Sequence, residues 1–397
     1  MSYARLVSRP YVPRALGGAL IGRLPTAMTA LAMTLTLRAH DADFRFVGAA
    51  TAVLAVAGAL GGPVLGRMVD RWGQTAVLLS SSAVAGCGTL LIAFGPTSRA
   101  PVLVGAALAG AATPPLEPCL RALWPVLVGR DNLRRAYALD AAAQELVFIG
   151  GPLLVSATLL LGPPEAAVVL SAGLGLVGSL VMATSRPSRE WRGSPGGHDW
   201  LGPLRSRPLV LLFVGLAGAG TAIGGLNIVA VAYAERHPLV GGAGTLLALS
   251  ACGALIGAVV YGRTGWSLAP TAQAALFGTG LATTYLLVAV MGPTPVMALV
   301  SLSTGLFLSP LLVVSFGLVD VMAPEGTLTE AFAWLITLLT TGTALGSALA
   351  GLVMEHGGPS AAAASTALCA LCGVGFLLGC HRLRRPVKQD SGASAAE

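Results

Sequence analysis

Four charged residues lie deep within long apolar runs of this sequence: Arg23, Glu117, Arg121 and Glu145. If these runs cross a bilayer, four charges facing lipid would cost on the order of 10–14 kcal/mol. That cost is comparable to the total stability of a protein, so the four side chains must face inward. Two acids and two bases can neutralise one another there, and a carboxylate in such a place can also take up and release a proton.

The spacing of these residues separates a structural role from a chemical one. Glu117 and Arg121 are four residues apart, the favourable orientation for an ion pair within one helix, and a self-satisfied structural pair is one interpretation of them. Arg23 and Glu145 have no such local partner. We therefore expect Glu145 to be the principal proton carrier and Arg23 to set its proton affinity, with Glu117 as the second candidate.

A second polar group, residues 66–73, follows an apolar, glycine-notched run and reads Gly-Arg-Met-Val-Asp-Arg-Trp-Gly. It includes Gly66, Arg67, Asp70, Arg71 and Gly73. The pattern predicts a short charged hairpin after a helix. In one interpretation Asp70 and the arginines only anchor a tight turn. In the other they form a contact with another part of the protein, and this contact breaks and re-forms as the protein works.

The composition indicates what must position these groups. Of 397 residues, 55% are hydrophobic and only 10% are charged, and the mean hydropathy is +0.79, which is typical of a membrane protein. A span needs roughly 20 apolar residues. Twelve such runs occur, at 14–37, 46–66, 75–95, 100–127, 137–162, 165–184, 208–232, 240–262, 270–291, 294–321, 328–353 and 359–380.

The chain repeats itself at an offset of 195 residues. Residues 253–255 repeat the Gly-Ala-Leu of residues 58–60, and Gly262-Arg263 answers Gly66-Arg67 one residue later, without the acidic residue. Such self-similarity indicates a duplicated unit. We predict an all-α membrane protein with twelve transmembrane helices in two pseudo-symmetric six-helix bundles, 1–184 and 208–381, joined by a cytoplasmic linker, 185–207, and followed by a cytoplasmic tail, 382–397.

The distribution of basic residues predicts the orientation. With the N-terminus inside, 18 of the 24 basic residues fall in cytoplasmic segments and four in outer loops. This asymmetry is typical of a protein of the cell membrane with both termini in the cytoplasm, and it accounts for the net charge of +7 without a nucleic-acid partner. The first run is expected to be an uncleaved helix.

Residues 66–73 resemble the signature loop of the major facilitator superfamily, Gly-x-x-x-Asp-Arg-x-Gly, although Gln74-Thr75 replace the basic pair that usually follows. With twelve spans and the duplication, the resemblance covers nearly the whole chain. The segments 22–25 and 328–334 are also similar to a bacterial efflux-permease branch. Gly151-Pro152 resembles part of an antiporter motif, but Val147 and Ser156 occupy two of its glycine positions.

The resemblance implies that helices one, four, seven and ten line a central cavity, while helices two and five meet helices eleven and eight. Asp70 would then lie near the start of the eleventh helix, where Thr327 and Glu330 have capping-box spacing. A carboxylate facing that N-terminus gains roughly 0.3–1 kcal/mol when exposed and up to about 2 when partly buried. Asp70 would thus latch the two halves together.

Two further features concern helix contacts and the cavity. Glycines recur every four residues at 58, 62 and 66, at 253 and 257, and at 342 and 346, which predicts close helix packing and, because the repeats match, a shared interface. Asn227 and Trp334, with threonines 337, 340 and 341, are the cavity candidates of the second half, and core packing is the alternative role for each of them.

These features favour a secondary transporter that exports a small, largely apolar compound in exchange for protons, embedded in the lipid bilayer and monomeric. No phosphate-binding loop is present, and no set of metal ligands or nucleophile and base is complete, so we expect no cofactor and no enzymatic activity. A proton-coupled sugar or metabolite permease is the first alternative. A transporter-like membrane sensor is the second, and the buried charges argue against it.

Overall fold

The computed structural model describes residues 3–193, 202–237 and 242–383, apart from the side chain of Phe44, and these residues form helices joined by short connections. Outside the described residues lie part of the predicted linker, 194–201, and most of the predicted tail, 384–397. The first half contains α1 (Tyr3–Val7), α2 (Val12–Ala39), α3 (Phe44–Trp72), α4 (Gln74–Phe94), α5 (Arg99–Ala111), α6 (Leu116–Val128), η1 (Arg130–Asn132), α7 (Leu133–Leu161) and α8 (Pro164–Ala183). The predicted linker contains α9 (Arg186–Glu190), which packs on α4, α6 and α8, and η2 (Gly202–Arg205). The second half contains α10 (Arg207–Arg236), α11 (Ala243–Arg263), α12 (Pro270–Val288), α13 (Thr294–Met322) and α14 (Leu328–Leu383).

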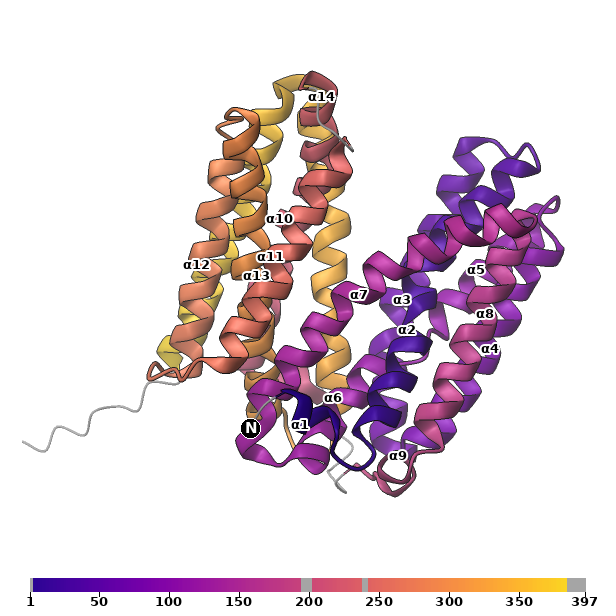
Figure 1. Cartoon of the computed structure of the whole chain (residues 1–397), viewed down its shortest axis with the longest axis horizontal. Helices are drawn as coiled ribbons and strands as arrows, with labels where there is room; N and C mark the ends of the chain where they lie inside the picture. The colour runs from indigo at the N-terminus through magenta and orange to yellow at the C-terminus, as the bar shows by residue number, and fades with distance from the viewer. Residues whose placement is uncertain (1–2, 194–201, 238–241, 384–397) are drawn as a thin grey trace, which may run out of the picture.

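The long helices form two bundles, α2 to α8 and α10 to α14, which converge at the end that carries the N-terminus and diverge toward the other (Figure 1). We call the converging end the closed end. Contacts between the bundles join α3 to α14, and α7 to α11 and α13. This is the twelve-helix, two-bundle fold that the sequence predicts, with helices two and five against helices eleven and eight.

Each predicted span corresponds to helix, but many of the helix boundaries differ from the predicted ones by several residues. In the described part of the chain, nine helices are long and apolar enough to cross a membrane, and one of these, α14, holds the last two spans. Gly358 separates them with a φ of 74°, a left-handed conformation that favours glycine. The ninth span is α12, and the fourth is made of α5 and α6 together.

The fourth span is not the continuous helix predicted over 100–127, because α5 ends at Ala111 and α6 begins at Leu116. Pro114 and Pro115 explain the break. A proline disfavours the helical conformation of the residue before it, and it has no N–H for a helical hydrogen bond. The break places Glu117 in the first turn of α6, where a negative charge is favoured by the helix dipole.

The predicted charged hairpin is shorter than expected. Helix α3 continues through Trp72 and α4 starts at Gln74, so Gly73 alone makes the turn, with a φ of 88°. A residue with a Cβ is strained in this conformation. Arg67, Asp70 and Arg71 therefore lie on the last turns of a helix, which fixes the direction in which each points.

The glycine notches form a shared interface at only some of the predicted positions. An added Cβ at Gly66 would lie 2.9 Å from Cα of Glu330 in the other bundle, and one at Gly62 would lie 3.2 Å from Oγ1 of Thr337. The glycines at 253 and 257 instead pack on α13, and those at 342 and 346 pack on α10, within the second bundle. Matching positions in the repeats thus do not all serve the same interface.

Candidate functional site

A buried charge network joins three helices of the first bundle. Nη1 of Arg23, on α2, donates to Oδ1 of Asp140 on α7 at 2.8 Å and to Oε1 of Gln144 at 3.2 Å. Nε of Arg121, on α6, donates to Oδ2 of the same Asp140 at 2.8 Å, and its Nη2 contacts Oε1 of Glu117. One carboxylate therefore bridges two guanidinium groups, and a second carboxylate completes the neutral set.

The members of this charge network differ in their access to solvent. The side chains of Asp140, Arg121 and Arg23 are 0%, 2% and 3% exposed, whereas that of Glu117 is 21% exposed. Several donors of the two guanidinium groups, Nε and Nη2 of Arg23 and Nη1 of Arg121, are buried without a hydrogen-bond partner in the described structure. Of these four side chains, that of Glu117 therefore has the most access to solvent.

Sequence reasoning missed Asp140, although it lies inside the predicted span 137–162. Asp140 is three residues from the start of that span, and a charge so close to the end of a span can reach water. Helix α7 in fact begins at Leu133, so Asp140 lies about two turns into the helix and is completely buried. Arg23, for which the sequence predicts a role beside Glu145, makes its hydrogen bonds with Asp140 and Gln144 instead.

Glu145 is separate from the charge network. It is partly buried, and it makes no hydrogen bond or ion pair with the rest of the described chain. Seven residues separate it from Ala138, so the two lie on the same face of α7. Ala138 packs against Gly262 of α11, which indicates that this face looks toward the second bundle.

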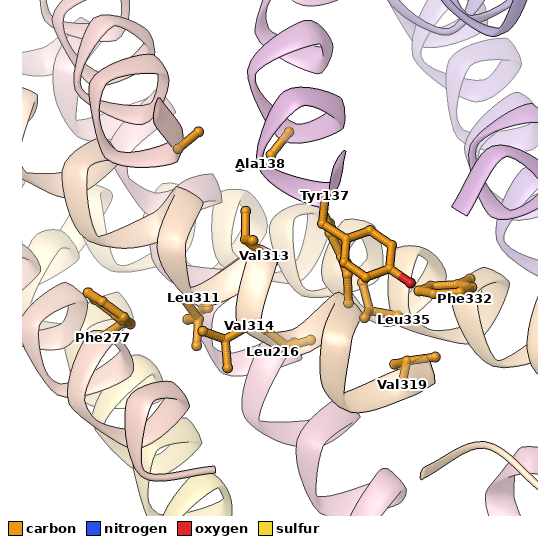
Figure 2. Close-up of a cluster of buried hydrophobic side chains, with 14 of the residues drawn as sticks. Tyr137, Ala138, Leu216, Phe277, Leu311, Val313, Val314, Val319, Phe332 and Leu335 are labelled. Carbon is orange, nitrogen blue, oxygen red and sulfur yellow. The ribbon is translucent and has the colours of Figure 1, made fainter. Parts of the chain in front are cut away.

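Aromatic side chains from both bundles meet beneath the charge network. The guanidinium of Arg121 lies 3.5 Å from the centre of the Phe316 ring on α13. Tyr137 of α7 contacts Phe316 at 5.9 Å and Phe332 of α14 at 6.2 Å between ring centres. Figure 2 shows Tyr137 and Phe332 among the buried apolar side chains of this region. These rings join the two bundles directly below the charges.

At the closed end, the carboxylate of Asp70 binds the N-terminus of α14. Its Oδ1 accepts from the N–H of Thr329 at 3.0 Å and its Oδ2 from the N–H of Glu330 at 2.8 Å. Arg67 donates from Nε and Nη2 to the two carboxylate oxygens of Glu330, at 3.0 and 2.6 Å. We call Arg67, Asp70 and Glu330, with this N-terminus, the carboxylate latch. The geometry confirms that Asp70 faces the start of the eleventh span.

The capping box predicted at Thr327 and Glu330 does not form. The hydroxyl and the N–H of Thr327 both donate to the carbonyl of Pro324, and the Glu330 carboxylate is held by Arg67. Asp70 of the other bundle satisfies the helix N–H groups that a local cap would satisfy. Because the cap of α14 comes from the other bundle, α14 loses this cap when the bundles separate.

The pseudo-symmetry of the chain reappears in two notches at the closed end. An added Cβ at Gly66 would lie 3.0 Å from Cβ of Ala333, and one at Gly262 would lie 2.7 Å from Cβ of Ala138. Ala138 and Ala333 are 195 residues apart, the offset of the repeat. Helix α3 therefore meets α14 in the same manner as α11 meets α7.

The remaining predicted site residues have the following places. The indole N–H of Trp334 donates to Oε1 of Glu330 at 3.3 Å, so in this structure Trp334 belongs beside the carboxylate latch. Asn227 is exposed on α10, and Arg71 is exposed on the last turn of α3. The pair predicted between Glu117 and Arg121 is present.

Comparison with known proteins agrees with this geometry. The family model described as Major Facilitator Superfamily matches residues 15–269. No curated protein sequence matches the chain. Among solved structures, the human organic anion transporter MFSD10 is 18% identical, with 95% of this chain and 100% of that chain covered and a TM-score of 0.72.

Two other solved structures share the fold. A bacterial homologue of the iron transporter ferroportin, in an outward-facing state, is 16% identical over 93% of this chain and 99% of that chain, with a TM-score of 0.76. The E. coli fucose:proton symporter is 16% identical over 95% and 99%, with a TM-score of 0.70. At these identities the likeness concerns the fold.

Proposed function

Because the chain belongs to the major facilitator superfamily, whose members are transporters, we propose that it exports small, largely apolar compounds in exchange for protons. The observation that carries this proposal is the set of carboxylates buried in the first bundle. Asp140 is locked between two arginines, Glu117 is partly exposed, and Glu145 has no cation beside it in the described structure.

The carboxylates suggest how a proton is coupled to movement. Keeping a buried carboxylate charged without a cation is costly, and a bound proton removes that cost. In our proposal Glu145 takes a proton while the closed end is shut and gives it up when rearrangement of the bundles brings water or a cation to it. Glu117, which is paired with Arg121, is the second candidate carrier.

The closed end, in our proposal, faces the cytoplasm of the cell and both chain termini lie on that side. Basic residues support this orientation, because the short connections and helix ends at the closed end are rich in arginine. The structure would then represent the outward-open state, the state in which an exporter releases substrate and accepts a proton from outside.

A largely apolar substrate is favoured by the second bundle. Two of the charged residues described in its spans lie near helix ends, Asp320 two residues from the end of α13 and Glu330 in the first turn of α14. The cavity candidates Asn227 and Thr340 are neutral and exposed. A bundle of this composition offers apolar surface and a few hydrogen bonds, as sites for small apolar ligands do.

The experiment is transport by the purified protein in vesicles that carry an imposed pH gradient, with a panel of neutral and cationic lipophilic fluorescent dyes. Molecules inserted with the closed end outward should move dye into an acidic lumen, and a protonophore should abolish the movement. Dye movement that is insensitive to the gradient would overturn proton coupling. Movement of sugars but of no dye would favour a permease.

A further inference from the structure

The short helix α1 is anchored to the first bundle. It packs on α2 and α7, and Leu6 is completely buried. Directly after α1, Nη1 of Arg9 donates to the carbonyl of Val128, at the end of α6, at 2.7 Å. Residues 3–9 are thus fixed to the helices that carry the charge network, although they precede the first span.

The same segment reaches the second bundle through Tyr3. Its hydroxyl donates to the carbonyl of Val259 on α11 at 3.4 Å, and the guanidinium of Arg263 lies 5.7 Å from the centre of its ring. An added Cβ at Gly262 would collide with the Tyr3 hydroxyl, so the ring end occupies the notch at that glycine. Burial raises the pKa of Tyr3, which keeps the hydroxyl protonated and able to donate.

The pseudo-symmetry explains why a contact is needed at this place. In the first repeat, the notch at Gly66 is flanked by Asp70, which binds the opposite helix. In the second repeat the corresponding position holds Trp266, so α11 has no carboxylate to offer to α7. What joins the bundles there instead is Tyr3, together with Nη1 of Arg134, which donates to the carbonyl of Thr264 at 2.8 Å.

We infer that residues 3–9 are a second latch, which holds the closed end shut by inserting Tyr3 into the notch at Gly262. Since the segment is fixed to one bundle and its tyrosine contacts the other, the contact must break whenever the closed end opens. The second latch therefore stabilises the state in this structure relative to the state that is open at the closed end. This inference goes beyond the proposed function and requires neither a known substrate nor proton coupling.

The test measures opening of the closed end by alkylation of a buried reporter. Val319 is completely buried among the side chains of Figure 2, so Val319→Cys in a cysteine-free background should react with a membrane-impermeant maleimide only while that end is open. Vesicles that expose the closed end give the reagent access. When opening is a fast equilibrium, the alkylation rate follows the open population.

Tyr3→Ala is expected to raise the alkylation rate about threefold to tenfold, the effect of losing one hydrogen bond and one ring contact. Tyr3→Phe, which keeps the ring, should give a smaller increase. Ser8→Ala is the matched control, because Ser8 is exposed on the same segment and its hydroxyl bonds only to the carbonyl of Arg5 in the described structure.

Two results would overturn the second latch. One is an alkylation rate in Tyr3→Ala within twofold of the parent. The other is a faster rate accompanied by a lower melting temperature and equal acceleration at a reporter in the core of the second bundle, such as Ala282→Cys, since that pattern shows general loosening. Either result leaves the proposed export function untouched, because no substrate enters the measurement.

Discussion

Asp140 is the residue that organises the polar interior of the first bundle. It accepts one hydrogen bond from each of two arginines on different helices and is completely buried. A buried ion pair gains little over an apolar pair, but removal of one partner leaves an uncompensated charge. Asp140 is therefore expected to position Arg23 and Arg121 rather than to exchange protons.

Asp140→Asn should destabilise the protein by about 3–5 kcal/mol, because two buried arginines would share the single charge of Glu117. In detergent we expect the midpoint of thermal unfolding to fall by about 5 °C or more. The matched control is Asp43→Asn: its pair with Arg99 is exposed, and asparagine also caps a helix. Equal midpoints for the two variants would refute the bridging role of Asp140.

At the scale of the helices, the carboxylate latch is a helix cap supplied by another bundle. The Asp70 carboxylate binds two N–H groups at the start of α14, and Arg67 holds the first acidic side chain of the same helix. Both contacts exist only while α3 and α14 touch. The cap therefore stabilises the state in which the closed end is shut relative to the state in which it is open.

Asp70→Asn should open the closed end more often. An asparagine side chain places an NH2 group where a carboxylate oxygen now faces an N–H, so one hydrogen bond and the charge are lost. We expect the alkylation rate of a cysteine at Val319 to rise about fivefold to thirtyfold, as for a loss of roughly 1–2 kcal/mol.

Asp131→Asn, on exposed η1, is the control for this prediction. It also removes a carboxylate from the first half of the chain, but it breaks no contact in the described structure. If the alkylation rate were the same in Asp70→Asn and Asp131→Asn, Asp70 would have only the structural role of a residue that anchors the turn.

The helices show which parts of the site the sequence can predict. The repeat at 195 residues and the signature at residues 66–73 predict both the fold and the position of Asp70 against α14. The break between α5 and α6 at residues 112–115 can also be predicted, because Thr113 is followed by two prolines. The cap of α14 was not, because Thr327 and Glu330 form a plausible local cap and only the packing of the bundles decides against it.

The whole molecule closes asymmetrically. The carboxylate latch joins α3 to α14, whereas Tyr3 and Arg134 join the first bundle to α11 and to Thr264 directly after it. The two glycine notches nevertheless obey the same pseudo-symmetry. The two sides therefore differ in chemistry: a carboxylate makes the contact on one side, and a tyrosine hydroxyl and an arginine bind backbone carbonyls on the other.

The orientation of the molecule has a direct test. Reporter fusions after Pro187 and after the last residue should both report the cytoplasmic side, because arginines are concentrated at the closed end. A fusion within the connection between α7 and α8 should report the outside. Finding either of the first two fusions on the outer face would reverse the assignment of the closed end and the direction of transport.

The most direct measurement of proton coupling compares two modes of transport by Glu145→Gln in reconstituted vesicles. In the proposed exchange, accumulation of a dye against its gradient requires the proton, whereas counterflow of labelled dye requires only the movement of the bundles. We expect Glu145→Gln to lose pH-driven accumulation and keep counterflow within about twofold, and Glu355→Gln, an exposed carboxylate on α14, to keep both. Normal pH-driven accumulation in Glu145→Gln would contradict the assignment of Glu145 as the proton carrier.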